Sequence, residues 1–111
     1  MATELVLLSD VALTEEAVTE VTFGLHPEGF VGVWRGGDLM QAFSAGWESL
    51  LTVHRPKVIH DSTEAATAIT NPPQGFALWS EMTIPIGDPS RGRELAEALA
   101  RRVGGVVRER V

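Results

Sequence analysis

The sequence contains no cysteine. Disulfide frameworks, thiolate zinc sites and cysteine nucleophiles are therefore excluded, and the composition suits a reducing cytoplasm. Long apolar runs are also missing: the first run, residues 5–8, has four residues and follows an acidic rather than a basic start. We therefore expect neither a signal peptide nor a membrane-spanning segment, and we predict a cytoplasmic protein.

What is present indicates one globular domain. The chain has 111 residues, of which 44% are hydrophobic and 22% are charged. A chain of this size and composition buries enough apolar surface to fold without a metal or a disulfide, and it is too short for a second core. We predict a single domain over residues 1–111.

The net charge of -6 is unevenly distributed along the chain. Residues 1–89 contain twelve acidic and three basic side chains, whereas residues 90–111 contain six arginines and three glutamates. An acidic body repels phosphate backbones and attracts basic partners, and no aromatic residues are interleaved with the arginines. The pattern favours a protein partner over a nucleic acid.

The first half of the chain shows a strand, a helix and a three-stranded meander. Residues 4–9 are apolar without alternation, which is typical of a strand covered on both faces. Thr14 is a good N-cap for a helix over residues 14–23, with Leu13 and Val18 as a hydrophobic staple. Strands over residues 30–35, 38–44 and 47–55 follow, and the Gly36-Gly37 pair suits a two-residue hairpin turn between the first two.

The registers of the meander assign its side chains to two faces, because cross-strand partners point the same way. One face is an ordinary core face: Val31, Val33, Met40, Ala42, Trp47, Leu51 and Val53. The other face mixes apolar and polar residues: Phe30, Trp34, Leu39, Phe43, Leu50, Gln41, Glu48, Thr52 and His54.

The second half continues with helices and strands in alternation. A capping box at Asp61 predicts a short helix to Ile69, and residues 76–84 form the next strand. Asp88-Pro89-Ser90 begins a helix that Gly104-Gly105 ends. Residues 106–111 could continue as helix, but two β-branched residues after the glycine pair favour a last strand. The order β-α-β-β-β-α-β-α-β predicts an α+β fold with helices packed on a mainly antiparallel sheet.

Three short sequence segments accompany this order of elements: Leu5-Val-Leu-Leu-Ser-Asp10, Val53-His-Arg-Pro-Lys-Val58 and Leu99-Ala-Arg-Arg-Val-Gly-Gly105. With them the chain resembles a group of small uncharacterised single-domain proteins of high-GC bacteria. The resemblance implies no catalytic residues.

Each candidate catalytic or metal site also has a simpler structural explanation. His54, His60 and Asp61, joined by His26, form a conceivable metal set, but the tight spacing of known motifs is missing, and strand-end, loop and cap positions explain these residues. Glu48 with His54, or Glu81 on the later strand, could serve acid–base catalysis, yet solvated strand positions account for them too. The serines lack a nucleophile elbow. We assign no catalytic residue, metal or cofactor.

A possible anion site lies at the start of the last helix. Ser90, Arg91 and Arg93 could hold a phosphate or carboxylate beside the permissive Gly92. Asp88 would repel the anion, and plain helix capping with solvated arginines explains the same residues.

A possible binding surface lies on the mixed face of the meander. Phe30, Trp34 and Phe43, with Glu48 and His54, have the composition of a binding patch, although a second layer could equally cover them as core. Trp79 has the same ambiguity.

The sequence is consistent with two functions. The first is a small acidic cytoplasmic protein-interaction module, adaptor- or immunity-like, which binds a protein partner or forms a homodimer through its sheet. The alternative is a small-molecule-binding domain or small enzyme whose pocket lies between the meander and the helices. Its residues would be Trp34, Arg35, Glu48 and His54.

Overall fold

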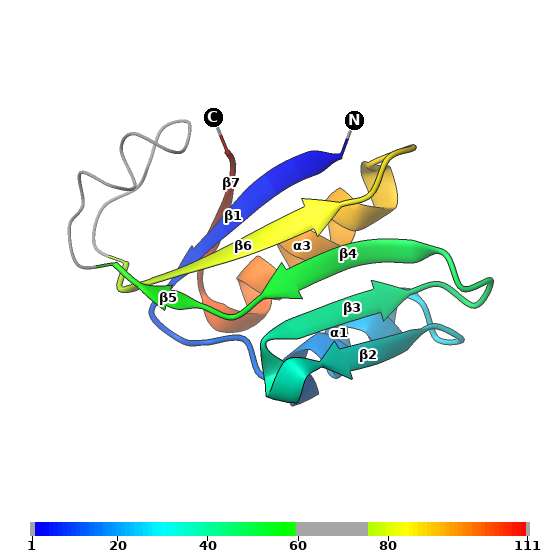
Figure 1. Ribbon diagram of the computed structural model, residues 1–111, viewed down its shortest axis with the longest axis horizontal. Helices are drawn as coiled ribbons and strands as arrows, with labels where there is room; N and C mark the ends of the chain where they lie inside the picture. Colours follow the sequence, from blue (N-terminus) through cyan, green and yellow to red (C-terminus); the bar gives the residue numbers. More distant parts are fainter. Residues whose placement is uncertain (1, 60–75, 111) are drawn as a thin grey trace.

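The computed structural model describes residues 2–59 and 76–110, which form a seven-stranded, antiparallel sheet with two helices packed on one face (Figure 1). The strands are β1 (Thr3–Ser9), β2 (Phe30–Trp34), β3 (Leu39–Phe43), β4 (Ser49–His54), β5 (Lys57–Val58), β6 (Leu78–Ile84) and β7 (Val106–Glu109). The helices are α1 (Glu15–Leu25) and α3 (Ser90–Val103). The predicted α+β fold class is confirmed.

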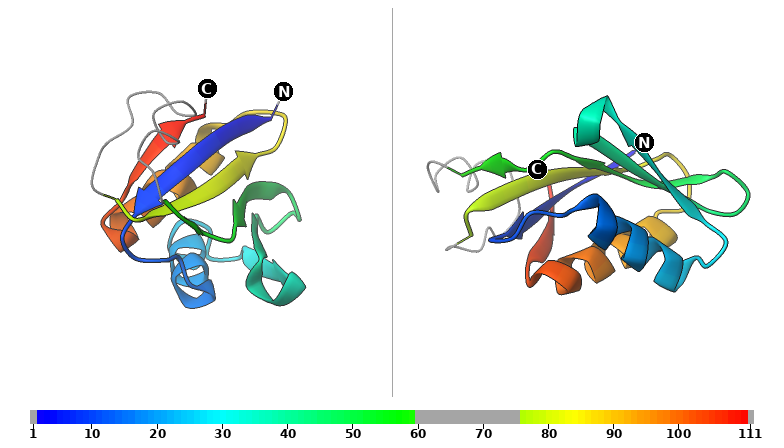
Figure 2. Two further views of the ribbon diagram at one scale, coloured as in Figure 1. Left: turned by 60° about the vertical axis from the view of Figure 1, so that its left-hand side comes forward. Right: turned by 90° about the horizontal axis from the view of Figure 1, so that it is seen from below.

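The strand order in the sheet is β2-β3-β4-β6-β1-β7, and the short β5 also pairs with β6. Both helices lie on the same side of the sheet, as the view from below shows (Figure 2). Helix α1 contacts β2 and β3, whereas α3 contacts β4, β6, β1 and β7. The sheet therefore has an inner face that the helices cover and an outer face that they do not.

The main core lies between the helices and the inner face. Leu5 and Leu7 of β1, Leu51 of β4, and Leu95 and Leu99 of α3 are at most 1% exposed. Burying a leucine side chain contributes about 1.5–3 kcal/mol each. Leu5 and Leu7 are two residues apart along β1, and Leu95 and Leu99 have the spacing i, i+4 along α3, so each pair points to one face.

Helix α1 begins where its cap predicts. The Thr14 side chain accepts a hydrogen bond from the Ala17 backbone N–H at 3.1 Å, and Leu13 and Val18 are both buried. The helix continues to Leu25, two residues beyond the predicted end, and His26 caps it.

Helix α3 ends where the glycine pair predicts. Gly104 adopts the left-handed conformation, with φ of 67°, and its N–H bonds to the carbonyls of Ala100 and Arg101. The chain then turns into β7, which pairs antiparallel with β1, so that the predicted last strand is confirmed.

The β2–β3 hairpin has the predicted register. Trp34 pairs with Leu39, and both Gly36 and Gly37 have positive φ values, of 66° and 101°. Arg35 also has a positive φ, of 52°, so the tight connection begins one residue earlier than the two-residue turn requires.

The β3–β4 pairing corrects two face assignments. The register shifts between Ala42 and Phe43, so that Phe43 pairs with Ser49 and β4 begins later than predicted. This irregularity places Leu50 in the inner core at 3% exposure, although we predicted it on the mixed face. Trp47 lies in the preceding loop and is 76% exposed, so its assignment to the core face is wrong.

The chain after β4 has one strand that was not predicted. β4 ends at His54, before Pro56, and the chain then rejoins the sheet as β5, whose Lys57 pairs with Trp79 of β6. The helix predicted over residues 61–69 lies outside the described residues. Within residues 2–59 and 76–110, no helix is long and apolar enough to cross a membrane.

Candidate binding surface

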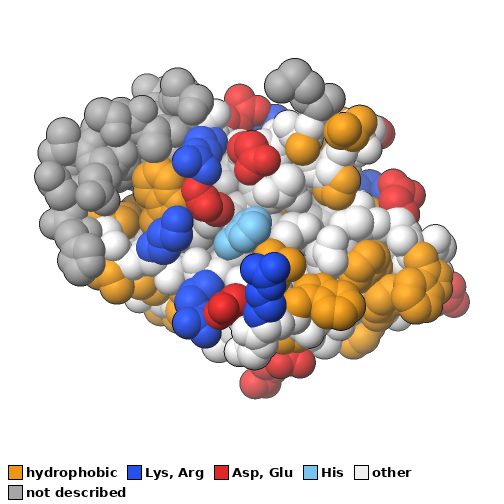
Figure 3. All heavy atoms as spheres, viewed as in Figure 1, with side chains coloured by type: hydrophobic (Ala, Val, Ile, Leu, Met, Phe, Trp, Pro, Cys, Tyr) orange, Lys and Arg blue, Asp and Glu red, His pale blue; other side chains and the backbone are white. Residues whose placement is uncertain are grey.

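The outer face of β2, β3 and β4 forms three rows of cross-strand neighbours. Pairing places Phe30, Phe43 and Ser49 in the first row, Gly32, Gln41 and Thr52 in the second, and Trp34, Leu39 and His54 in the third. Figure 3 shows this face, with hydrophobic side chains gathered at the end of the molecule where these strands lie. The predicted binding residues Phe30, Trp34, Phe43 and His54 therefore share one face.

Four aromatic residues form what we call the aromatic patch: Phe30, Trp34, Phe43 and Trp47. The rings of Phe30 and Phe43 are stacked, with centroids 4.7 Å apart, and Trp47 meets Phe30 edge-on at 4.6 Å. Such aromatic pairs contribute about 0.5–1.5 kcal/mol beyond the area they bury. The patch is therefore an ordered surface and not a set of loose side chains.

Trp34 is held in place by a chain of polar contacts. A Cβ on Gly32 would lie 3.2 Å from Cζ2 of the Trp34 ring, so the indole lies over the bare backbone of that glycine. The indole N–H donates to Gln41 at 3.2 Å, and the Gln41 amide donates to Ser49 at 3.3 Å. Trp34 is nevertheless 50% exposed, which leaves half of its surface open to a partner.

Trp47 is presented by a tight loop built around Ser44. The Ser44 carbonyl accepts from the Trp47 N–H at 3.0 Å, and the Ser44 hydroxyl accepts from the Glu48 N–H at 3.3 Å. Trp47 has a φ of 64°. This left-handed conformation costs a non-glycine residue about 1–2 kcal/mol. Strand alternation wrongly predicted Trp47 on the core face; Ser44, whose side chain competes with the strand for backbone hydrogen bonds, is the signal in the sequence for the loop.

Glu48 and His54 do not meet. Glu48 lies just before β4, and its carboxylate pairs with Arg91 of α3 at 2.6 Å. His54 ends β4 on the outer face, six residues and so about 20 Å further along the strand. The pocket expected for a small-molecule enzyme would have needed both, together with Trp34 and Arg35, but Glu48 lies at the opposite end of the meander from the row that contains Trp34 and His54.

The groups of the predicted anion site all have partners within the chain. The Ser90 N–H donates to the Asp88 carboxylate at 3.0 Å, Arg91 pairs with Glu48, and Arg93 pairs with Glu109. The hydrogen bond from the Ser90 backbone, followed by one from its side chain, lowers the pKa of Asp88 below 3.8. A carboxylate of this chain therefore already lies at the positive end of α3.

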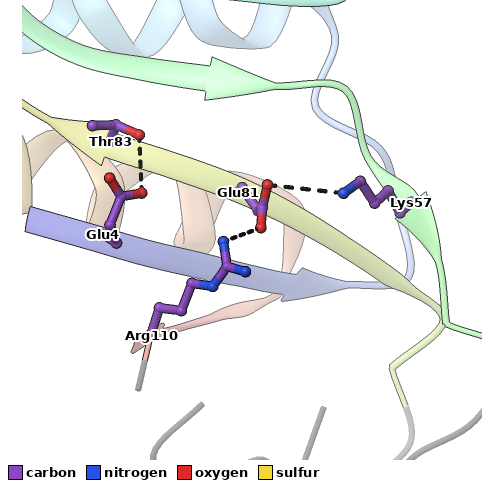
Figure 4. A network of polar contacts seen from close by, with 5 residues as sticks. All are labelled: Glu4, Lys57, Glu81, Thr83 and Arg110. Atoms are coloured by element: carbon purple, nitrogen blue, oxygen red, sulfur yellow. Dashed lines mark hydrogen bonds and ion pairs between the residues drawn. The ribbon is translucent and has the colours of Figure 1, made fainter. Parts of the chain in front are cut away.

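A charged network covers the outer face next to the aromatic patch (Figure 4). Glu81 of β6 lies between Lys57 of β5, at 3.9 Å, and Arg110, while Thr83 donates to Glu4 at 3.1 Å. Exposed ion pairs of this kind contribute little stability, about 0–1 kcal/mol. Their consequence is that the outer face of β6 and β1 presents paired charges, whereas that of β2–β4 presents aromatic rings.

A second apolar cluster lies on the outer face beside this network. Val6 and Leu8 of β1 are buried there against partly buried neighbours: Ile59, Phe76, Trp79 and Val106. Trp79 thus packs into a small apolar cluster. Of its two predicted roles, core or binding surface, the structure supports core packing. A hollow of about 200 Å³ lies between Trp79, Glu81 and β5.

No metal site is formed by the residues that the structure describes. Among residues 2–59 and 76–110 no three or more histidine, aspartate or glutamate side chains converge on one point. His60 and Asp61 of the conceivable metal set lie outside these ranges, and the two remaining histidines, His26 and His54, lie on separate elements.

The fold and surface together define a small α+β domain with helices on one face of its sheet and an exposed aromatic patch on the other. The sequence matches no protein-family model, and no curated protein or solved structure is significantly similar to it. Function is therefore inferred from the geometry of this chain.

Proposed function

We propose that this chain is a non-enzymatic, cytoplasmic protein-interaction domain, adaptor- or immunity-like, which binds a protein partner through its aromatic patch. The single observation that carries the proposal is the exposure of ordered tryptophans: Trp34 is 50% and Trp47 is 76% exposed, on the face opposite α1 and α3 (Figure 2). Aromatic residues with a polar surround dominate the binding energy of many protein interfaces.

The backbone at Trp47 adds a second line of support. An aromatic residue held at a φ of 64° by hydrogen bonds to Ser44 is unfavourable for the free domain. Strained conformations of this kind concentrate at binding and catalytic sites, where the strain serves to present a side chain. A glycine at position 47 would suit the loop better, so the ring itself is what we expect function to require.

Charge favours a protein partner with basic residues. Three arginines of the C-terminal segment are engaged with Glu48, Glu20 and Glu81, so they form no free basic stripe for a nucleic acid. The net charge of -6 then steers basic partners toward the domain. A partner with an apolar anchor and a basic rim fits both features.

Co-purification from the native host tests this proposal with a matched pair of variants. The patch variant Trp34→Asp with Trp47→Asp places two charges among the aromatic rings. The control Ile86→Asp changes a side chain that is 79% exposed and lies outside the patch, between β6 and α3. We expect one protein to co-purify with the wild-type chain and the control but not with the patch variant. A partner retained equally by all three, or by none, would overturn the proposal.

A further inference from the structure

The free edge of β2 is the second surface that the fold leaves open. In the strand order of the described residues, β2 pairs with β3 on one side and has no strand on the other. Its sequence, Phe-Val-Gly-Val-Trp, has no charged residue and no proline. The opposite edge strand, β7, carries Arg108 and Glu109. Charges and proline are the usual protection of an edge against pairing, so β2 is the unprotected edge.

The β2 sequence is nearly symmetric about Gly32. Val31 and Val33 flank the glycine, and the aromatic residues Phe30 and Trp34 flank the valines. In an antiparallel pair with a second copy, centred on Gly32, each valine faces the other valine and each Phe30 faces the second copy's Trp34. A two-fold contact needs a surface that complements itself, and this strand meets that condition.

The charges at the ends of β2 also complement one another. Glu28 and Arg35 are exposed, and among the described residues neither has an ion-pair partner. In the same antiparallel register Arg35 of one copy lies opposite Gly29 of the other and Glu28 lies opposite Gly36, so at each end of the pair the two opposite charges are one position apart. This arrangement favours antiparallel over parallel pairing of the two strands, because parallel pairing would bring like charges together.

The position of α1 is compatible with this pairing of two β2 strands. Because α1 contacts both β2 and β3, it lies over these two strands. Strands are about 4.8 Å apart, so a second copy joined at β2 places its α1 about 10 Å away. Packed helices are separated by about 8–10 Å.

We propose that two copies of this chain associate through their β2 strands, antiparallel about a two-fold axis at Gly32, to form one continuous sheet. The pairing places the two aromatic patches side by side on the same outer face, with Phe30 next to the second copy's Trp34. This association is separate from the proposed function, because it is measured on the purified chain without a partner.

Light scattering after size-exclusion chromatography gives the first test. We expect a mass that rises with concentration toward about 24 kDa, twice the 12.0 kDa of the chain, and no further, because a two-fold contact closes on itself. A mass of 12.0 kDa at every concentration would overturn the inference. So would open-ended growth, which indicates head-to-tail pairing of β2 with β7.

Disulfide trapping tests the register, because the chain has no cysteine of its own. Gly32→Cys places two thiols opposite each other at the axis; the new Cβ meets only the exposed Trp34 ring, which can shift. Thr52→Cys is the control, on the same face but two strands further in. We expect mild oxidation to link the first variant and not the second. Equal linking of both, or linking of Thr52→Cys alone, contradicts the register.

Exchanging the charges of Glu28 and Arg35 tests the pairing of the two copies without changing any residue of β2. We expect Arg35→Glu to weaken dimerisation about fivefold or more, because position 35 lies within one position of Glu28 of the second copy, and the double variant Arg35→Glu with Glu28→Arg to restore it. Both positions are exposed, so the variants should fold. A double variant as weak as the single one argues against the pairing.

Discussion

Two non-glycine residues with left-handed backbone conformations, Arg35 and Trp47, lie at the two ends of the aromatic patch. Both are exposed and both belong to tight connections of the meander. At each position the local hydrogen bonds fix a conformation that the side chain itself disfavours. At the scale of single residues, the patch is therefore shaped by its backbone as well as by its rings.

Replacing Trp47 with glycine separates its structural from its functional contribution. Glycine relieves a backbone cost of about 1–2 kcal/mol and loses an aromatic contact of about 0.5–1.5 kcal/mol, so the free energy of unfolding should change by no more than about 1.5 kcal/mol. Partner binding should nevertheless fall sharply. Chemical denaturation and the co-purification assay measure the two effects. A large loss of stability would show that Trp47 serves the fold.

Sequence reasoning found three of the four aromatic residues of the patch and missed the fourth. Phe30, Trp34 and Phe43 follow from strand alternation and a hairpin register that the Gly36-Gly37 turn fixes. Trp47 could not be placed in this way, because a period of two applies only within a strand. The Ser44 hydrogen bonds that end β3 and form the loop depend on a short-range competition that alternation does not capture.

At the scale of elements, Gly92 determines how closely α3 packs on the sheet. A Cβ at this position would lie 2.6 Å from the Leu50 carbonyl oxygen and 2.8 Å from Cγ2 of Ile84. Only a residue without a side chain allows this approach. The glycine that appeared permissive for an anion site is thus explained by packing.

Gly92→Ala should destabilise the domain by about 1–3 kcal/mol through overpacking, even though alanine favours a helix by about 1 kcal/mol over glycine. Glu97→Ala, at an exposed position of the same helix, is the control and should leave the unfolding free energy nearly unchanged. Thermal or urea denaturation measures both. If Gly92→Ala raised the stability instead, the close approach of α3 would be wrong.

Asp88 at the start of α3 should make stability depend on pH in acid. The hydrogen bonds from Ser90 lower its folded-state pKa below 3.8, so its contribution is present above that value and is lost as the pH falls through the folded-state pKa. Asp88→Asn should therefore be less stable than the wild type at neutral pH, and the difference should shrink in acid below pH 3.8. An NMR titration that gives a pKa at or above 3.8 for Asp88 would contradict this assignment.

Elements whose ends depend on nearby residues were predictable, and those that depend on distant ones were not. The Thr14 cap and the Gly104 stop act within a single turn of helix, and both predictions are confirmed. The pairing of β5 with β6 depends on a strand that lies far away in the sequence, and it has no local signal. The register shift after Ala42 arises in the short connection between β3 and β4, where alternation does not apply, and it moved Leu50 into the core.

At the scale of the whole molecule, the basic C-terminal segment folds against the acidic body. Arg91, Arg102 and Arg110 of the basic segment pair with Glu48, Glu20 and Glu81 of the acidic body. The arginines thus connect the last helix and strand to the first part of the chain, and the molecule presents acids and aromatic rings in place of a basic tail. The sequence shows that acidic and basic residues are divided between the two parts of the chain. Which of them pair is determined by the tertiary structure.

Site-specific photo-crosslinking in the native host tests the central claim, that the aromatic patch binds a protein partner, most directly. A benzophenone amino acid at position 47 reports on the patch, and one at position 86 reports on an equally exposed site elsewhere. We predict an adduct of one protein species heavier than two copies of the chain from position 47 and none from position 86. Equal adducts from both positions, or no heterologous adduct from position 47, would contradict the account.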